Sequence, residues 1–243
     1  MNQANGDGRP KPQDDNIVPL PTLAERDRMR REKEKLERAA TRISEPMINL
    51  PHVTKWLLGI ILAIFLVTNI LLPAEYADLA IGTFGFVPEA WHADGFNPLN
   101  LMTPFTHMFF HGGWMHVMMN LFMLAAFGSG VERWLGGKKT LILFIASGLF
   151  GVLAHYLLNT ASPYPMIGAS GGLSGLFAAA LIMMSRGQRE MGGRFGILPF
   201  AIIWIGLSIG FGMLGGPDGS MVAWAAHVGG FIGGFIVLKA MRA

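Results

Sequence analysis

The sequence contains no cysteine among its 243 residues. This absence excludes a disulfide framework, a thiolate nucleophile and any metal site built on cysteine. Charge is also scarce, at 14% of the residues, and it is unevenly distributed. No lysine or arginine lies between Lys55 and Arg133, whereas ten of the 19 fall within residues 1–50. The net charge of +3 therefore reflects where the basic residues are placed along the chain and does not indicate a nucleic-acid partner.

Long stretches without charge fill the chain from Trp56 onward. Apolar stretches of roughly 17–25 residues are long enough to cross a bilayer as helices. Six are predicted: Trp56–Leu72, Trp114–Val131, Thr140–Leu158, Ala169–Ser185, Phe195–Leu214 and Met221–Lys239. Six such spans leave too little polar surface for a water-soluble protein. The sequence therefore predicts an all-α polytopic membrane protein with a bundle of six transmembrane helices.

The first fifty residues differ in character from the rest of the chain. Residues 1–22 are rich in Pro, Asp, Asn and Gly, which predicts disorder. Residues 23–43 mix acidic and basic side chains and predict a charged helix. No short apolar stretch with a cleavage site opens the chain, so a signal peptide is not expected. We expect a tail over residues 1–50 and a membrane domain over residues 51–243.

The basic residues predict the orientation of the spans. All of them fall in the tail or in alternate loops, whereas the loops at about 73–113, 159–168 and 215–220 together hold five acidic residues and no Lys or Arg. Loops rich in Lys and Arg stay on the cytoplasmic side of a membrane. Both termini are therefore expected to be cytoplasmic.

Four polar side chains gather near the outer ends of three predicted spans: His116, Asn120, Ser170 and His227. His116 and Asn120 are four residues apart, so they share a helix face. Ser170 is the second residue of its span, and His227 is expected about two turns into the last span. Polar side chains inside a membrane are costly and tend to be functional.

The length of the fourth span predicts the depth of Ser170. Seventeen residues make a helix of about 25 Å, which is short for a hydrocarbon core of roughly 30 Å. Ser170 is therefore expected below the membrane surface, with the loop at 159–168 dipping inward. Irregular backbone at that depth is tolerated only where it is buried in protein or lines a cavity containing water.

These residue types indicate acyl-transfer chemistry. A serine hydroxyl becomes a useful nucleophile when a neighbouring base accepts its proton, and His227 is the candidate base. The predicted spans contain no carboxylate, so the sequence predicts a Ser–His dyad. His116, Asn120 and the Ser170 backbone N–H are the candidate donors to a developing oxyanion.

Glycines spaced four apart would allow two of the helices to approach closely. They are Gly171 and Gly175 on the fourth span, and Gly230 and Gly234 on the sixth. Taken singly, each feature has a simpler explanation: helix packing for the glycines, and interhelical hydrogen bonding for Asn120. The functional interpretation depends on their occurrence together at one depth.

The chain resembles the rhomboid family of intramembrane serine proteases over roughly residues 50–240. The motifs that carry the resemblance are His107-x3-His111-x4-His116-x3-Asn120, Glu132-Arg133-Trp134-Leu135-Gly136, Gly168-Ala169-Ser170-Gly171 and Ala226-His227-Val228-Gly229-Gly230. The resemblance implies cleavage of membrane-anchored, single-span protein substrates without metal or cofactor. It assigns Ser170 as nucleophile, His227 as base, and His116 and Asn120 to the oxyanion hole.

The same resemblance implies a bacterial inner-membrane protein with its site opening to the outer side, and structural roles for His107 and His111 in the outer loop. Two positions depart from the family. Ser174 stands where some bacterial members carry a tyrosine beneath the base, and the first outer loop lacks the family's Trp-Arg pair. Another group must therefore hold His227.

Three alternative functions fit the sequence less well. A metal protein would use His107, His111 and His116, but the spans supply no acidic ligand to complete such a site. A transporter or channel with a polar cavity would leave the serine–histidine pairing unexplained. An inactive binder of membrane segments would have no need of Ser170 and His227. The natural substrate and the oligomeric state stay open.

Overall fold

The computed structural model describes residues 22–44, 49–94, 97–190, 196–215 and 223–241. Contacts divide the chain into one unit over residues 1–49 and another over residues 50–243. The described residues are almost entirely helical and contain no strand, only an isolated antiparallel bridge between Phe86 and Met166. The predicted all-α class is confirmed. Of the segment predicted to be disordered, only Thr22 is among the described residues.

The first unit contains one described helix, α1 (Leu23–Ser44). Thr22 and Glu25 form a reciprocal cap at its start. The Thr22 N–H and Oγ1 donate to Glu25 Oε2 at 2.7 and 2.8 Å, and the Glu25 N–H donates to Thr22 Oγ1 at 3.3 Å. The hydrogen bond from the Thr22 backbone N–H is the larger cause, and the one from the Thr22 hydroxyl the smaller, of a Glu25 carboxyl pKa below its usual range.

The second unit contains a helical segment at each of the six predicted spans. They are α2 (His52–Leu66) continued by the π-helical turn η1 (Val67–Leu71); α6 (Trp114–Met123) continued by the π-helical turn η3 (Leu124–Gly128) and α7 (Ser129–Leu135); α8 (Gly137–Leu158); α9 (Ser170–Glu190); α10 (Leu198–Leu214); and α11 (Trp224–Ala240). Three segments, His52–Leu71, Trp114–Leu135 and Gly137–Leu158, are long and apolar enough to cross a membrane, and α10 and α11 are shorter apolar helices. The chain is an integral membrane protein.

Three expectations about these helices were wrong. Helix α9 has 21 residues where 17 were expected, so its length does not indicate a submerged Ser170. Helix α11 begins at Trp224, which places His227 in the first turn and not two turns in. The second segment, which consists of α6, η3 and α7, continues to Leu135. It therefore includes the carboxylate of Glu132, although the spans were expected to contain none.

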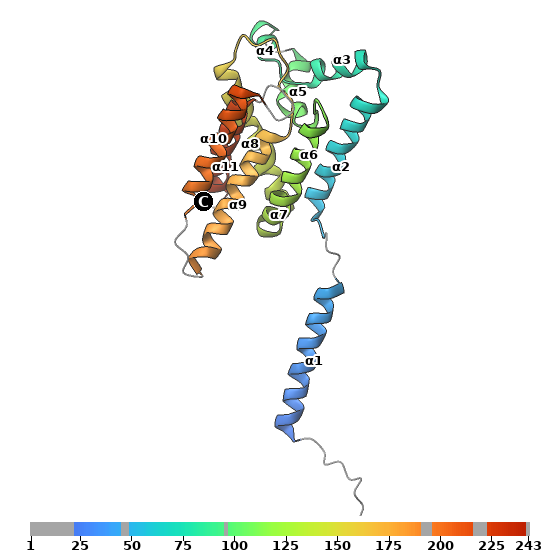
Figure 1. Cartoon of the computed structure of the whole chain (residues 1–243), viewed down its shortest axis with the longest axis vertical. Coiled ribbons are helices and arrows are strands. Elements are labelled where there is room, and N and C mark those ends of the chain that lie inside the picture. Colours follow the sequence, from blue (N-terminus) through green and yellow to red (C-terminus); the bar gives the residue numbers. More distant parts are fainter. Residues whose placement is uncertain (1–21, 45–48, 95–96, 191–195, 216–222, 242–243) are drawn as a thin grey trace, which may run out of the picture. The chain divides into compact units, whose positions relative to one another are not determined.

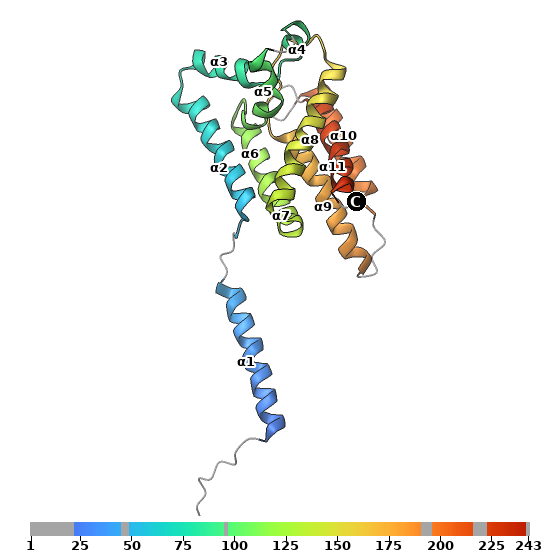
Figure 2. The same cartoon turned by 180° about the vertical axis from the view of Figure 1, so that it is seen from behind.

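The long loop at about 73–113, called the outer loop after its expected side, contains short helices that the sequence analysis did not predict. They are α3 (Ala74–Phe84), α4 (Pro88–Asp94), α5 (Pro98–Thr106) and the 3-10 turn η2 (His107–Phe109). Proline at the first position favours starting α4 and α5, and the Asn97 side chain accepts the Leu99 N–H at 3.0 Å. In Figures 1 and 2, α3, α4 and α5 gather at the end of this unit opposite α7.

Helices α8, α9 and α11 pack against one another through glycine. A side chain at Gly230 would overlap the carbonyl oxygen of Gly171, and a Cβ at Gly234 would lie 2.5 Å from the Cα of Gly175. The predicted glycine faces of α9 and α11 therefore meet. Helix α8 joins them, because a Cβ on Gly151 would lie 2.8 Å from the Ala226 carbonyl oxygen.

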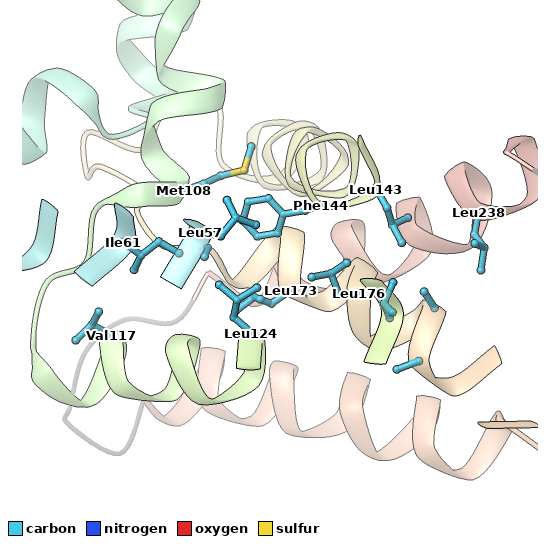
Figure 3. Close-up of a cluster of buried hydrophobic side chains, with 14 of the residues drawn as sticks. Leu57, Ile61, Met108, Val117, Leu124, Leu143, Phe144, Leu173, Leu176 and Leu238 are labelled. Atoms are coloured by element: carbon cyan, nitrogen blue, oxygen red, sulfur yellow. The ribbon is translucent and has the colours of Figure 1, made fainter. Parts of the chain in front are cut away.

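The largest hydrophobic cluster lies beside this glycine contact. Leu57 and Ile61 of α2, Leu124 of the second segment and Phe144 of α8 surround Leu173 of α9, and all five are 5% exposed or less. Figure 3 shows these side chains converging from the separate helices. The cluster ties α2 and α6 to the three glycine-packed helices.

A buried carboxylate joins the second segment to the start of α2. Glu132 Oε1 accepts the Val53 N–H at 2.9 Å, and Oε2 accepts the N–H and hydroxyl of Thr54 at 2.7 and 2.8 Å. The first N–H groups of a helix have no partner within it. Glu132 supplies that partner from another helix and also places negative charge at the positive end of α2.

We predict that Glu132→Ala destabilises the membrane domain by about 2 kcal/mol or more, because buried donors at the start of α2 lose their acceptor. The free energy of unfolding, measured by titration with a denaturing detergent, checks this. Glu75→Ala, at an exposed position of α3, is the matched control. Equal stability of the two variants would contradict the capping role.

We predict that Gly230→Ala also lowers the free energy of unfolding, by about 2 kcal/mol or more, because the new methyl group overlaps the backbone of α9. Gly206→Ala is the control, since nothing lies within 4 Å of a Cβ at Gly206 on α10. The same detergent titration distinguishes them. A Gly230→Ala protein as stable as the control would show that the two backbones do not touch.

Candidate active site

Ser170 is the first residue of α9, and the two residues before it are fixed by the outer loop. The Gly168 N–H donates to the His107 carbonyl oxygen at 2.9 Å, and the Ala169 N–H donates to His111 Nε2 at 3.5 Å. Gly168 has φ of 119°, a conformation that favours glycine. His107 and His111, expected to support the outer loop, thus contact the serine segment directly.

The chain just before this segment is buried within the protein. Phe86 and Met166 exchange backbone hydrogen bonds at 3.0 and 2.8 Å. Phe86 is 1% exposed and packs on Trp91 and Tyr156, with ring centroids 5.8 and 6.2 Å away. Trp91 also donates to the Asn100 carbonyl oxygen at 2.8 Å, which links α4 to α5. The irregular backbone directly before Ser170 is therefore enclosed by protein.

Ser170 and His227 are in direct contact. Ser170 Oγ lies 2.8 Å from His227 Nε2, and this contact joins the first turns of α9 and α11. With the imidazole neutral and its proton on Nδ1, the serine hydroxyl donates to Nε2. This is the arrangement in which a histidine accepts a serine proton.

His116 and Asn120 lie on α6 near the serine segment. The His116 ring packs edge-on against His111, with centroids 4.9 Å apart. A Cβ at Gly168 would lie 2.7 Å from His116 Nε2, so this nitrogen is next to the serine segment. Asn120 is buried, and its Nδ2 donates to the His116 carbonyl oxygen at 2.8 Å. The Asn120 Oδ1 is buried without a hydrogen-bond partner among the described residues.

Two residues near His227 bear on how the base is held. Ser174, the departure from the family pattern, is fully buried, and its hydroxyl donates back to the Ser170 carbonyl oxygen at 2.8 Å. The indole of Trp204 on α10 lies 6.3 Å from the His227 ring, with the planes inclined at 36°. The sequence analysis missed Trp204, because one tryptophan in an apolar span carries no positional signal.

The contacts of His107 bear on the alternative of a metal site in the long loop. His107 Nδ1 faces the Thr103 carbonyl oxygen at 3.0 Å and so is oriented by α5. Within the described ranges, no three His, Asp or Glu side chains lie close enough together to hold a metal ion.

Comparison with known proteins places the chain among the rhomboids. The family model of the rhomboid domain matches residues 98–242, which is more than half of the chain. The chain is 32% identical to the rhomboid protease GluP of Bacillus subtilis (strain 168) over 141 residues, which cover 58% of this chain and 25% of that protein. It is also 32% identical to RHOMBOID-like protein 5 of Arabidopsis thaliana over 127 residues, covering 52% of this chain and 40% of that protein.

The chain is also 32% identical to the rhomboid protease GlpG of Salmonella choleraesuis (strain SC-B67) over 153 residues. These residues cover 60% of this chain and 50% of that protein. The chain thus spans half or less of the length of these three relatives. The matched region contains α6 to α11 and all four predicted site residues. On the strength of the domain match, the chain belongs to the rhomboid family.

Proposed function

We propose that this protein is an intramembrane serine endopeptidase that cleaves membrane-anchored proteins in or near their transmembrane segment. The observation that carries the proposal is the 2.8 Å contact between Ser170 Oγ and His227 Nε2 within a helical membrane domain. Family membership supports it, since relatives such as GluP and GlpG are named rhomboid proteases. Neither metal nor cofactor takes part in the proposed reaction.

The proposed reaction has two stages. Ser170 Oγ attacks the carbonyl carbon of the scissile peptide while His227 Nε2 accepts the hydroxyl proton. That proton then passes to the leaving amine, the C–N bond breaks, and an acyl-serine ester remains. His227 next takes a proton from water, the resulting hydroxide attacks the ester, and Ser170 recovers its proton as the acid leaves.

The oxyanion formed in each stage needs donors. Ser170 opens α9, and the first N–H groups of a helix are free of partners within the helix and lie at its positive end. We assign the Ser170 N–H, His116 Nε2 and the second N–H of Asn120 Nδ2 as the donors. The first N–H of that amide is used by the His116 carbonyl oxygen, which fixes the plane of the amide.

The proposal includes the placement of the chain. The tail over residues 1–50 and both termini lie in the cytoplasm of a bacterial cell, the membrane domain over residues 51–243 lies in the inner membrane, and the site opens to the outer side. The absence of Lys and Arg from the outer-loop sequence supports this orientation. A water-filled approach to Ser170 supplies the second substrate.

We predict that the purified protein in liposomes cleaves a model single-span substrate and that Ser170→Ala and His227→Ala each abolish cleavage. Without the nucleophile or its base, no acyl-serine ester forms. Gel analysis of the substrate measures the product. Chelating agents should leave the rate unchanged. Full activity in Ser170→Ala would disprove the assignment, and loss of activity on chelation would indicate a metal enzyme.

We predict that His116→Ala and Asn120→Ala each lower kcat by on the order of 10²–10³ with little change in KM, because a removed oxyanion donor acts on the transition state. Steady-state kinetics on the folded variants separates the two constants. Met119→Ala is the control, since Met119 neighbours Asn120 and is 51% exposed. A raised KM with unchanged kcat would instead assign these residues to substrate binding.

A further inference from the structure

The contacts of the His227 ring bear on how the base is oriented. Across the described ranges, the side-chain hydrogen bond of His227 is the one with Ser170, and no carboxylate receives its other nitrogen. Glu132, the acid within the second segment, is occupied by Val53 and Thr54. An imidazole held at one point can still rotate, and packing against its faces restricts that rotation.

Trp204 supplies that packing from α10. Its ring centroid lies 6.3 Å from that of His227, within the 4.5–7 Å range of aromatic pairs, and the planes are inclined at 36°. Helix α10 contacts α11, and near their outer ends a side chain at Gly212 would overlap the Trp224 ring. The backbone that carries Trp204 is thus fixed against the helix that carries the base.

The position of the indole is itself determined by aromatic contacts. Phe177 of α9 lies 4.8 Å from Trp204 between ring centroids, and it packs on Phe127 at 4.9 Å and on Phe231 at 6.0 Å. Phe177 is two turns beyond Ser170, and Phe231 is one turn beyond His227. The contacts therefore link Ser170 to His227, His227 to Trp204, and Trp204 to Phe177. Phe177 lies on α9, the helix that also carries the serine.

The indole is held by its faces and not through its N–H. Trp204 Nε1 is buried and has no hydrogen-bond partner among the described residues. A buried donor without a partner is destabilising, so it gives no reason for a tryptophan in preference to another aromatic ring. The aromatic faces of Trp204 are therefore the part of this residue that contacts the site.

We propose that Trp204 is the positioning residue for His227: its indole holds the imidazole in the plane that directs Nε2 at Ser170 Oγ. The inference rests on the proposed function and explains how a Ser–His dyad works without a carboxylate. The Ser174 hydroxyl donates to the Ser170 carbonyl oxygen. Trp204 packs on His227 from α10, and Phe177 packs on Trp204 from α9.

Kinetics of substituted proteins test the proposal. Trp204→Leu should lower kcat by roughly tenfold to a hundredfold with KM unchanged, because a small misplacement of a catalytic group is costly. Trp204→Phe should recover most of the rate, since it keeps an aromatic face. Ile203→Ala, at the neighbouring position, which is 58% exposed, is the control and should match wild type. An unchanged kcat with a raised KM in Trp204→Leu would overturn the proposal and place Trp204 on the substrate's path.

Fluorescence provides a second test that needs no proteolytic activity. A protonated imidazole quenches an indole that it touches, so the emission assigned to Trp204, taken as wild type minus Trp204→Phe, should fall as His227 is protonated. The change should persist in His116→Asn and disappear in His227→Asn. If the emission does not respond to His227, the positioning role is wrong even if the protein is an active protease. If the emission responds to His227 but the protein cleaves no substrate, the proposed protease function is wrong. The contact between the Trp204 and His227 rings is supported all the same.

Discussion

The contact between the backbones of α9 and α11 is the constraint on which the rest of the structure depends. Gly230 lies so close to Gly171 that a single methyl group would overlap the carbonyl oxygen between them. Next to this contact, Ser170, which directly precedes Gly171, meets His227, one turn before Gly230, at 2.8 Å. A serine hydroxyl and an imidazole are short side chains, so helices separated by larger residues would hold them apart. Helix α8 packs on the same contact and leaves the pair little freedom to separate.

The serine is fixed from its other side by irregular structure. The outer loop supplies acceptors for the N–H groups of Gly168 and Ala169, and the bridge between Phe86 and Met166 encloses the approach. These contacts place the start of α9 while glycine packing places its axis. At the opposite end of the membrane domain, Glu132 joins the second segment to α2. The glycine contact therefore serves both stability and site geometry, whereas Glu132 stabilises the helices away from the site.

Much of this organisation could be predicted because the signals are periodic or compositional. Uncharged stretches located the six helices, and glycines four apart located the contact between α9 and α11. Helix ends were less accurate: polar residues continue α9 to Glu190, and the described helix α11 begins at Trp224. The role of α8 was missed, although Ser147 and Gly151 show the same four-residue spacing. The proximity of Trp204 to His227 could not be found from sequence, because it comes from a contact between α10 and α11.

The reactivity of Ser170 in proteins with altered glycines tests the central claim most directly. The rate of covalent labelling by a fluorophosphonate would be compared in wild type, Gly230→Ala and Gly206→Ala, each verified as folded. If glycine packing holds the dyad together, labelling of Gly230→Ala falls at least about tenfold, whereas Gly206→Ala labels at the wild-type rate, since the added methyl group of Gly206→Ala meets no neighbour. Wild-type labelling of a folded Gly230→Ala protein would contradict the account.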